Sequence, residues 1–208
     1  MPHLIDISVL LRPGTPEWPG DTPYSCGWSW EIAEGASVNV SAITTSPHVG
    51  THADAPLHVT DGWPGSETLP LESFMGRAFV LGIETQHQVL ELRDLEARIP
   101  RDTERLLLRT GQSIASGAFP HAWPALSPDC ATALAGRGLR LLGVDCPSVD
   151  DRESKTLETH RALFAAGVSV MENLDLRGVD DGEYRLIALP LRLDGLDAAP
   201  VRAVLERP

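Results

Sequence analysis

The first 60 residues contain no convincing helical pattern, and this constrains the fold more than any other feature of the sequence. Residues 3–11 show the apolar alternation of a strand, and four prolines in residues 12–23 exclude regular structure there. Residues 24–33 and 37–45 are strand candidates, and the Glu34–Gly35 turn between them predicts a hairpin. Doubly wound folds alternate strands and helices throughout, so this beginning disfavours one.

Helical spacing occurs in the later part of the chain, between segments with strand patterns. The spacing predicts helices over 89–99, 127–138 and 154–167, and a short helical turn over 70–76. Strands are expected over 77–84, 104–111, 139–146, 168–174, 183–193 and 199–206. A chain of 208 residues with 42% hydrophobic residues can bury the core of one domain. We therefore expect a single mixed α/β domain over residues 1–208, with a central sheet or half-open barrel and flanking helices.

The charge balance excludes several classes of partner. The net charge is −12, and no block rich in lysine or arginine occurs, which disfavours nucleic acids and anionic membranes as partners. No stretch approaches the roughly 18 apolar residues of a spanning helix, and the beginning does not resemble a signal peptide. The three cysteines form no CxxC motif, so we expect three buried thiols. These features together predict a cytoplasmic protein.

Residues 46–58, SPHVGTHADAPLH, are the strongest chemical signal. His48, His52, Asp54 and His58 fall within eleven residues, and a glycine and two prolines indicate a tight loop. Imidazole and carboxylate are the ligands of zinc, manganese and iron. His48, His52 and Asp54 supply the three ligands that a catalytic metal takes, while the two oxygens of Asp54 could bridge to a second ion. A histidine-rich surface loop is the plainer interpretation.

A second ion would need ligands from elsewhere in the chain. The candidates between residues 145 and 175 are Asp145, Asp150, Asp151, His160, Glu172 and Asp175. His160 lies within a predicted helix, where a partly exposed ring is the usual situation. Glu172 ends an apolar strand, where a carboxylate is costly unless it is paired or bound to a metal.

The sequence resembles the bacterial kynurenine formamidases, arylformamidases within the wider group of cyclase-like metal-dependent hydrolases. The segments that carry this resemblance are DIS, PEWPGDTP, SVNVSAITTSPHVGTHADAPLH, LLRTG, LLGVDCPSVD, SKTLETH, ENLDL and LIALPLRLDGLDAAPVRAVL. They run nearly from end to end. The HxGTHxDAPxH core is typical of the wider group, whereas PEWPGDTP, DCPSVD and ENLDL are typical of the formamidases.

The resemblance implies a site with two zinc ions, although Mn²⁺ or another divalent ion would suit the same ligands. His48, His52 and Asp54 would bind one zinc, and Asp54 would bridge to a second zinc bound by His160 and Glu172. For His160 and Glu172 the resemblance carries most of the assignment.

The resemblance also implies a catalytic role for His58, as proton donor and acceptor, and a substrate contact for Trp18. It implies a swivelling β/β/α fold, a homodimer, and hydrolysis of N-formyl-L-kynurenine to L-kynurenine and formate in tryptophan degradation. Trp18 as a core or interface aromatic, and His58 as a residue that only orients a metal ligand, are open alternatives. Asp145, Cys146 and Asp150 receive no role.

Three other functions are compatible with the residues. The chain could open isatin or hydrolyse another formamide or lactam with the same metals. It could bind or store metal without catalysis. A redox iron enzyme with two histidines and a carboxylate is the third alternative.

Overall fold

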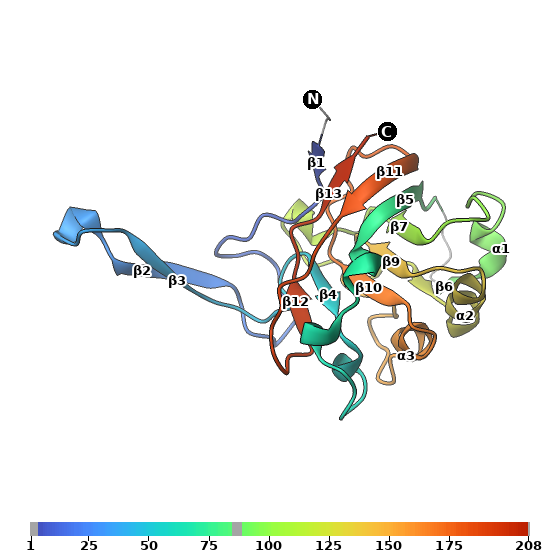
Figure 1. Ribbon diagram of the computed structural model, residues 1–208, viewed down its shortest axis with the longest axis horizontal. Helices are drawn as coiled ribbons and strands as arrows, with labels where there is room; N and C mark the ends of the chain where they lie inside the picture. Colours follow the sequence, from blue (N-terminus) through green and yellow to red (C-terminus); the bar gives the residue numbers. More distant parts are fainter. Residues whose placement is uncertain (1–3, 85–88, 208) are drawn as a thin grey trace.

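The computed structural model describes residues 4–84 and 89–207, and its centre is one curled sheet of nine strands (Figure 1). In spatial order the strands are β1 (Leu4–Asp6), β13 (Val204–Glu206), β11 (Gly182–Ile187), β5 (Met75–Gly82), β7 (Arg105–Arg109), β9 (Leu141–Val144), β10 (Ser169–Glu172), β4 (His52–Asp54) and β12 (Ala198–Pro200). Strands β5, β7, β9 and β10 run parallel to one another, and the strands on both sides of them pair antiparallel. The predicted mixed α/β class is confirmed.

Both faces of the sheet are buried at its central strands β7, β9 and β10, which explains the continuous apolar runs of these strands. On β7, Leu106 and Leu108 belong to one apolar cluster and Leu107 belongs to the other, as the alternation of a strand requires. The helices α1 (Leu92–Leu95), α2 (Pro128–Gly136) and α3 (Glu158–Ala165) lie on one side of the sheet (Figure 1). Leu134 of α2 and Leu163 of α3 join the same cluster as Leu106, so these two helices cover that face.

The sheet curls until its two edges approach each other, and this confirms the expected half-open barrel. Strand β12 lies at one end of the strand order and β13 lies one strand from the other end, yet only residues 201–203 separate them. A link of this length spans at most about 14 Å. Within it, the N–H of Val201 bonds to the carbonyl of Thr51, and the carbonyl of Ala203 accepts from the N–H of Ile7. The link therefore connects the sheet edge that holds β4 and β12 with the opposite edge that holds β1 and β13.

The helix expected over 89–99 is wrong. Val89–Leu90 is a short strand, β6, which pairs parallel with β8 (Ala125–Leu126), and only the four residues of α1 follow as helix. Leu90 is fully buried and pairs with Leu126, so a tertiary contact takes precedence over the local helical spacing. The strand predicted over 183–193 ends at Ile187, ahead of Pro190, and the one over 199–206 divides into β12 and β13.

The predicted hairpin is present and projects from the body of the protein (Figure 1). It consists of β2 (Ser25–Trp30) and β3 (Val40–Thr44), and every residue of both strands is exposed. Cys26 lies in β2 and is exposed, so the expectation of three buried thiols is wrong for this residue and confirmed for Cys130 and Cys146. Within the described part of the chain, no helix has the length and apolar character needed to cross a membrane.

Candidate active site

Two neighbouring strands supply three of the five candidate metal ligands. Strand β4 lies between β10 and β12, and His52 on β4 is directly opposite Glu172 on β10. Side chains alternate along a strand, so His52 and Asp54 project from the same face of β4. The local sequence therefore supplies two candidate ligands, and strand pairing supplies a third from a distant segment.

The described side chains form two donor groups that share Asp54. In the first group, Oδ1 of Asp54 lies 3.1 Å from Nδ1 of His48 and 3.2 Å from Nε2 of His52. In the second, Nε2 of His160 lies 3.3 Å from Oδ2 of Asp54 and 3.1 Å from Oε1 of Glu172. Each oxygen of one carboxylate thus faces a different group, as a bridging carboxylate would.

Hydrogen bonds around the two groups fix which ring nitrogens face the carboxylates. Nδ1 of His52 donates to the carbonyl of Gly50 over 2.9 Å, and Nδ1 of His160 donates to Asp150 over 2.6 Å. In each ring the hydrogen lies on the outward nitrogen, so neutral His52 and His160 present the lone pair of Nε2 toward Asp54. Metal-binding histidines are oriented by this type of contact.

The donor groups fit a divalent cation. Asp54 is fully buried, and neither its Oδ1 nor Nε2 of His52 has a hydrogen-bond partner among the described residues. Lone pairs of imidazole and carboxylate that face each other in a buried site need a positive charge between them. Imidazole nitrogens and carboxylate oxygens are also the donor set that zinc and manganese accept.

The pKa shifts of Asp54 and His160 arise from the same contacts between imidazole and carboxylate groups. Burial raises the pKa of Asp54, but the imidazoles of His52, His160 and His48 outweigh burial and hold this pKa well below its usual value. Burial disfavours the charged form of His160, whereas Glu172 and Asp150 favour it, and the net effect raises the pKa of His160 well above its usual value. The site therefore favours positive charge at its centre.

Asp150 has two roles in placing His160. Its carboxylate accepts from the backbone N–H groups of Thr159 and His160, over 2.9 and 3.0 Å, at the beginning of α3. The same carboxylate accepts from the ring of His160. His160 is 1% exposed, which excludes the alternative of a partly exposed ring on the helix. The helix points this ring into the site because one acidic side chain holds both its backbone and its ring.

A glycine is required between the first two histidines. Gly50 has a φ of +76°, and a Cβ at this position would lie 2.5 Å from Cδ2 of Leu11. A side chain at residue 50 would meet both backbone strain and a steric clash. The turn orients the carbonyl of Gly50 toward His52, so it also sets the ring orientation of a candidate ligand.

His58 lies beside these groups but outside them. It ends a short 3-10 helix (Pro56–His58), is half-buried, and has its ring centre 4.4 Å from that of His48 and 5.9 Å from that of His160. This position next to both groups is where a proton carrier would stand.

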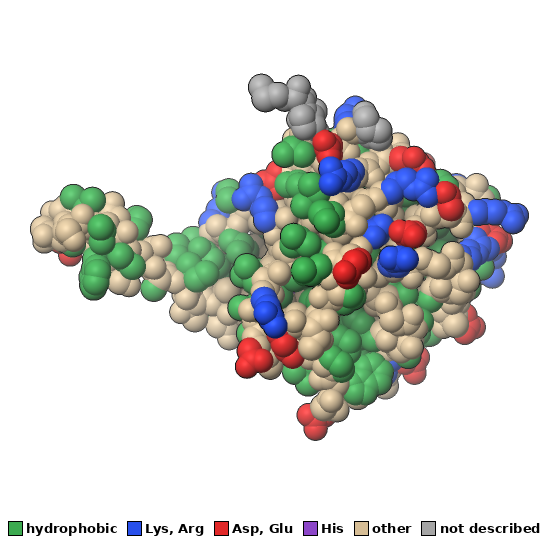
Figure 2. Space-filling model, viewed as in Figure 1, with side chains coloured by type: hydrophobic (Ala, Val, Ile, Leu, Met, Phe, Trp, Pro, Cys, Tyr) green, Lys and Arg blue, Asp and Glu red, His purple; other side chains and the backbone are tan. Residues whose placement is uncertain are grey.

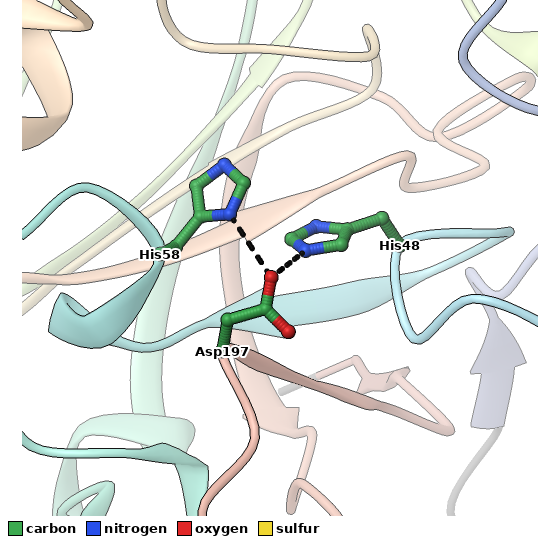
Figure 3. Close-up of side chains that lie close together, drawn as sticks. All are labelled: His48, His58 and Asp197. Atoms are coloured by element: carbon green, nitrogen blue, oxygen red, sulfur yellow. Dashed lines mark hydrogen bonds and ion pairs between the residues drawn. The ribbon is translucent and has the colours of Figure 1, made fainter. Parts of the chain in front are cut away.

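Asp197 is the residue that sequence reasoning missed. It directly precedes β12, and its Oδ2 lies 3.0 Å from Nε2 of His48 and 3.4 Å from Nδ1 of His58 (Figure 3). His48 and His58 lower the pKa of Asp197, while Asp197 and Asp54 overcome burial and raise the pKa of His48 to about 10. The only signal in the sequence is an acidic residue ahead of a short apolar strand, which does not distinguish Asp197 from Asp194.

A cavity of about 410 Å³ opens over the donor groups. Six of the seven predicted site residues line it, namely Trp18, His48, His52, His58, His160 and Glu172, and the seventh, Asp54, lies fully buried. Trp18 is 39% exposed and packs edge-to-face on Phe119 and Trp123, with ring centres 5.5 and 5.9 Å away. Trp18 is therefore not a core residue, and it forms part of an aromatic wall.

The remaining acidic candidates lie outside the donor groups. Asp145 accepts from the backbone of Thr110 and Gly111 and from the hydroxyl of Thr110, so it organises a turn. Asp175 pairs with Arg177 at the surface, and Asp151 is exposed. The buried thiol of Cys146 contacts the carbonyl of Ser148.

Comparison with known proteins shows the family. The model of the Cyclase family matches residues 5–151. The kynurenine formamidase of Bordetella avium is 42% identical over 206 residues, which cover 99% of each chain. Among solved structures, a potential metal-dependent hydrolase with cyclase activity is 29% identical and superimposes with a TM-score of 0.86, over 100% of this chain and 99% of the other.

Isatin hydrolase A of Ralstonia solanacearum has the same fold, with a TM-score of 0.81, 22% identity, and coverage of 100% of this chain and 92% of that one. The fold, the paired donor groups and the relatives lead to one conclusion: the chain belongs to the Cyclase family, among cyclase-like metal-dependent hydrolases, and is a hydrolase.

Proposed function

We propose that this chain hydrolyses N-formyl-L-kynurenine to L-kynurenine and formate, a step of tryptophan degradation. The observation that carries the proposal is a pair of donor groups, joined by one buried carboxylate, beneath a cavity with an aromatic wall. The kynurenine formamidase relative, similar over 99% of the chain, supports this substrate.

His48, His52 and Asp54 would hold one zinc ion, and Asp54, His160 and Glu172 a second; Mn²⁺ or another divalent ion would suit the same donors. When bound, such ions supply a Lewis acid that lowers the pKa of water and polarises a carbonyl oxygen. The chain's contribution is to hold five side chains at fixed positions and to exclude bulk water from Asp54, which is fully buried.

His58 would carry the proton. An aryl amide breaks down only if its leaving nitrogen receives a proton, and a histidine can hold and deliver one near neutral pH. Nδ1 of His58 faces Asp197, so Nε2 is the ring nitrogen left for the substrate. The ring lines the cavity, within reach of an amide bond placed over the donor groups.

The lining of the cavity favours an aromatic substrate with a charged end. Trp18 and Phe119 offer apolar surface to an aryl ring. Asp21, Arg152 and Lys155 also line the cavity, and Lys155 is the only lysine in the chain. Within the described residues the ammonium of Lys155 has neither an ion pair nor a hydrogen bond. N-formyl-L-kynurenine carries a carboxylate and an ammonium that these groups could bind, whereas isatin carries neither.

The hairpin supports a homodimer, which we also propose. Trp28, Trp30 and Ile43 are each at least 60% exposed, and apolar side chains follow the arm in Figure 2. In the pairing of β2 with β3, Cys26 is opposite Ile43 and Trp30 is opposite Val40. Contiguous exposed apolar residues mark interaction surfaces, and a second copy of the chain offers the same arm. The cytoplasmic location stays a prediction.

The substrate proposal is tested by steady-state kinetics on zinc-loaded protein with N-formyl-L-kynurenine and isatin. We expect kcat/KM for the formamide to exceed that for isatin by at least about 100-fold, because differences in buried polar contacts discriminate substrates strongly. His58→Ala should retain its metal and lose about 100- to 10,000-fold in kcat, the usual contribution of a general acid. Rapid opening of isatin with negligible formamide turnover would reject the proposal, and absence of both reactions would favour a protein that only binds metal.

The metal stoichiometry is tested by titration of zinc into chelator-treated protein, with the metal content measured on the same sample. Wild type should bind two ions per chain, and Glu172→Gln should bind one tightly, because the second group loses its anionic oxygen. Glu153→Gln changes the same functional group at an exposed site and should bind two. A wild-type chain that saturates at one ion would contradict the shared role of Asp54.

Lys155→Met tests the charged end of the substrate. We expect KM for N-formyl-L-kynurenine to rise about tenfold with little change in kcat, since one charge-assisted contact is lost. For 2-formamidoacetophenone, which lacks the amino-acid end, the KM values of wild type and variant should agree. Lys155→Arg should retain most of the affinity. An equal effect on both substrates would show that Lys155 shapes the cavity and does not bind the carboxylate.

The dimer is tested by light scattering during size exclusion. Wild type should elute at twice the chain mass of 22.5 kDa, and the double variant Trp28→Ser, Ile43→Ser should elute as a monomer with its fold retained by circular dichroism. Leu71→Ser, at a residue that is also 57% exposed but lies outside the hairpin, is the control. A monomeric wild type, or a double variant that remains dimeric, would refute this role of the arm.

A further inference from the structure

We propose that Asp197 is a positioning residue that fixes the ring orientation of His58 and of His48 at once. The inference rests on the proposed function for the role of His58 as proton carrier. Asp197 contacts His48 and His58, and it acts through these two histidines (Figure 3).

The geometry shows one oxygen shared by two rings. Oδ2 of Asp197 lies 3.0 Å from Nε2 of His48 and 3.4 Å from Nδ1 of His58. An ionised carboxylate only accepts hydrogen bonds, so both of these ring nitrogens carry the hydrogen. In a neutral ring, the form in which an imidazole binds a cation, the opposite nitrogen has a lone pair: Nδ1 of His48 faces Asp54, and Nε2 of His58 remains for the substrate.

The tautomer of His48 also decides between two uses of the cluster of His48, His58 and Asp197. His48, His58 and Asp197 could be considered a third metal group, since their donor atoms lie within 4.8 Å of one another. A neutral imidazole has only one nitrogen with a lone pair. When Nδ1 of His48 serves the group with Asp54, Nε2 carries the hydrogen and cannot bind an ion. Asp197 is therefore an acceptor in the working site and not a ligand.

Main-chain contacts place Asp197 relative to the donor groups. Its carbonyl accepts from the N–H of Ala55 over 2.8 Å, and the next residue, Ala198, is paired with Asp54 across β12 and β4. The carbonyl of Ala55 in turn accepts from the N–H of His58 over 2.9 Å. One run of main-chain contacts thus fixes the carboxylate, the bridging aspartate and the proton carrier relative to one another.

The rings of His48 and His58 lie close together, so the oxygen that they share affects the orientation of both. The ring centres of His48 and His58 are 4.4 Å apart and the rings are tilted by 45°, so a rotation of either would bring it against the other. Groups that orient metal-binding histidines typically contribute 10- to 100-fold in metal affinity or activity. Loss of Asp197 should therefore affect proton delivery and the first metal group together.

The test compares wild type, Asp197→Ala, Asp197→Asn, His58→Ala and the double variant Asp197→Ala, His58→Ala, all as zinc-loaded full chains. Asp194→Ala is the matched control, because Asp194 is an exposed acidic residue three positions earlier in the same segment. Circular dichroism and thermal unfolding confirm that each variant is folded, and Asp197→Asn, nearly isosteric with the native residue, serves if the alanine variant is not.

The first measurement does not depend on the substrate. Nitrogen-15 spectra of the histidine rings should show His58 with its hydrogen on Nδ1 in wild type and in Asp194→Ala, and a mixture of tautomers in Asp197→Ala. Competition with a chelator should show about 10- to 100-fold weaker binding of one zinc in Asp197→Ala. Unchanged tautomers and unchanged zinc affinity would overturn the proposal even if N-formyl-L-kynurenine proved not to be the substrate.

The second measurement is kinetic. Asp197→Ala should lower kcat for N-formyl-L-kynurenine about 10- to 100-fold at saturating zinc, with a smaller change in KM. In the His58→Ala background, at saturating zinc so that the weaker metal binding through His48 no longer limits the rate, the same substitution should lower kcat by no more than about twofold, because residues that act through one another are not additive. An equal loss in both backgrounds would overturn the role of Asp197 in positioning His58.

Discussion

The buried carboxylate of Asp54 is the constraint around which this molecule is organised. A charge without solvent exposure is expensive unless partners compensate it, and removal of one partner from such a cluster typically costs about 3–5 kcal/mol. Here each oxygen of Asp54 faces imidazole, with His48 and His52 on one side and His160 on the other. These partners come from a turn, a strand and a helix, so three separate elements must be placed correctly before this charge is tolerable.

The curl of the sheet makes that placement feasible. Strand β4 has only three residues and would be a weak edge alone, but β10 and β12 pair with it on both sides. The strand β12 reaches β4 because the chain crosses between the two edges of the sheet in residues 201–203. Closure of the half-barrel therefore pairs β12 with the edge of β4 and buries Asp54. It also places Asp197, which precedes β12, on the open side of the site.

How far the sequence predicted this site depends on how local each contact is. His48, His52 and Asp54 were predictable because the spacing of a turn and a three-residue strand fixes their relation. The chemistry of His160 and Glu172 was recognisable, but their convergence on Asp54 depends on strand pairing and on the cap that Asp150 provides to α3.

Two other features depended wholly on tertiary structure. Asp197 acquires its contacts only when the half-barrel closes, and nothing in its neighbourhood in the sequence distinguishes it from other acidic residues. The predicted helix over 89–99 fails for the same reason, since the partner of Leu90 is Leu126 and lies outside any local window. Local periodicity reports which face of a segment is apolar, but not which segment it will meet.

Carboxylates that contact more than one histidine connect the side chains of the site into one network. A continuous series of polar contacts runs through His58, Asp197, His48, Asp54, His160 and Asp150 to the beginning of α3. Each carboxylate in this series contacts at least two groups, so a shift of one ring disturbs the contacts of the next. In the proposed reaction the proton and the polarising charge must meet at one amide bond, and small misplacements are costly for such alignment. In this proposal, the contacts of Asp197 with His48 and His58 would keep the proton carrier aligned with the first metal ligand.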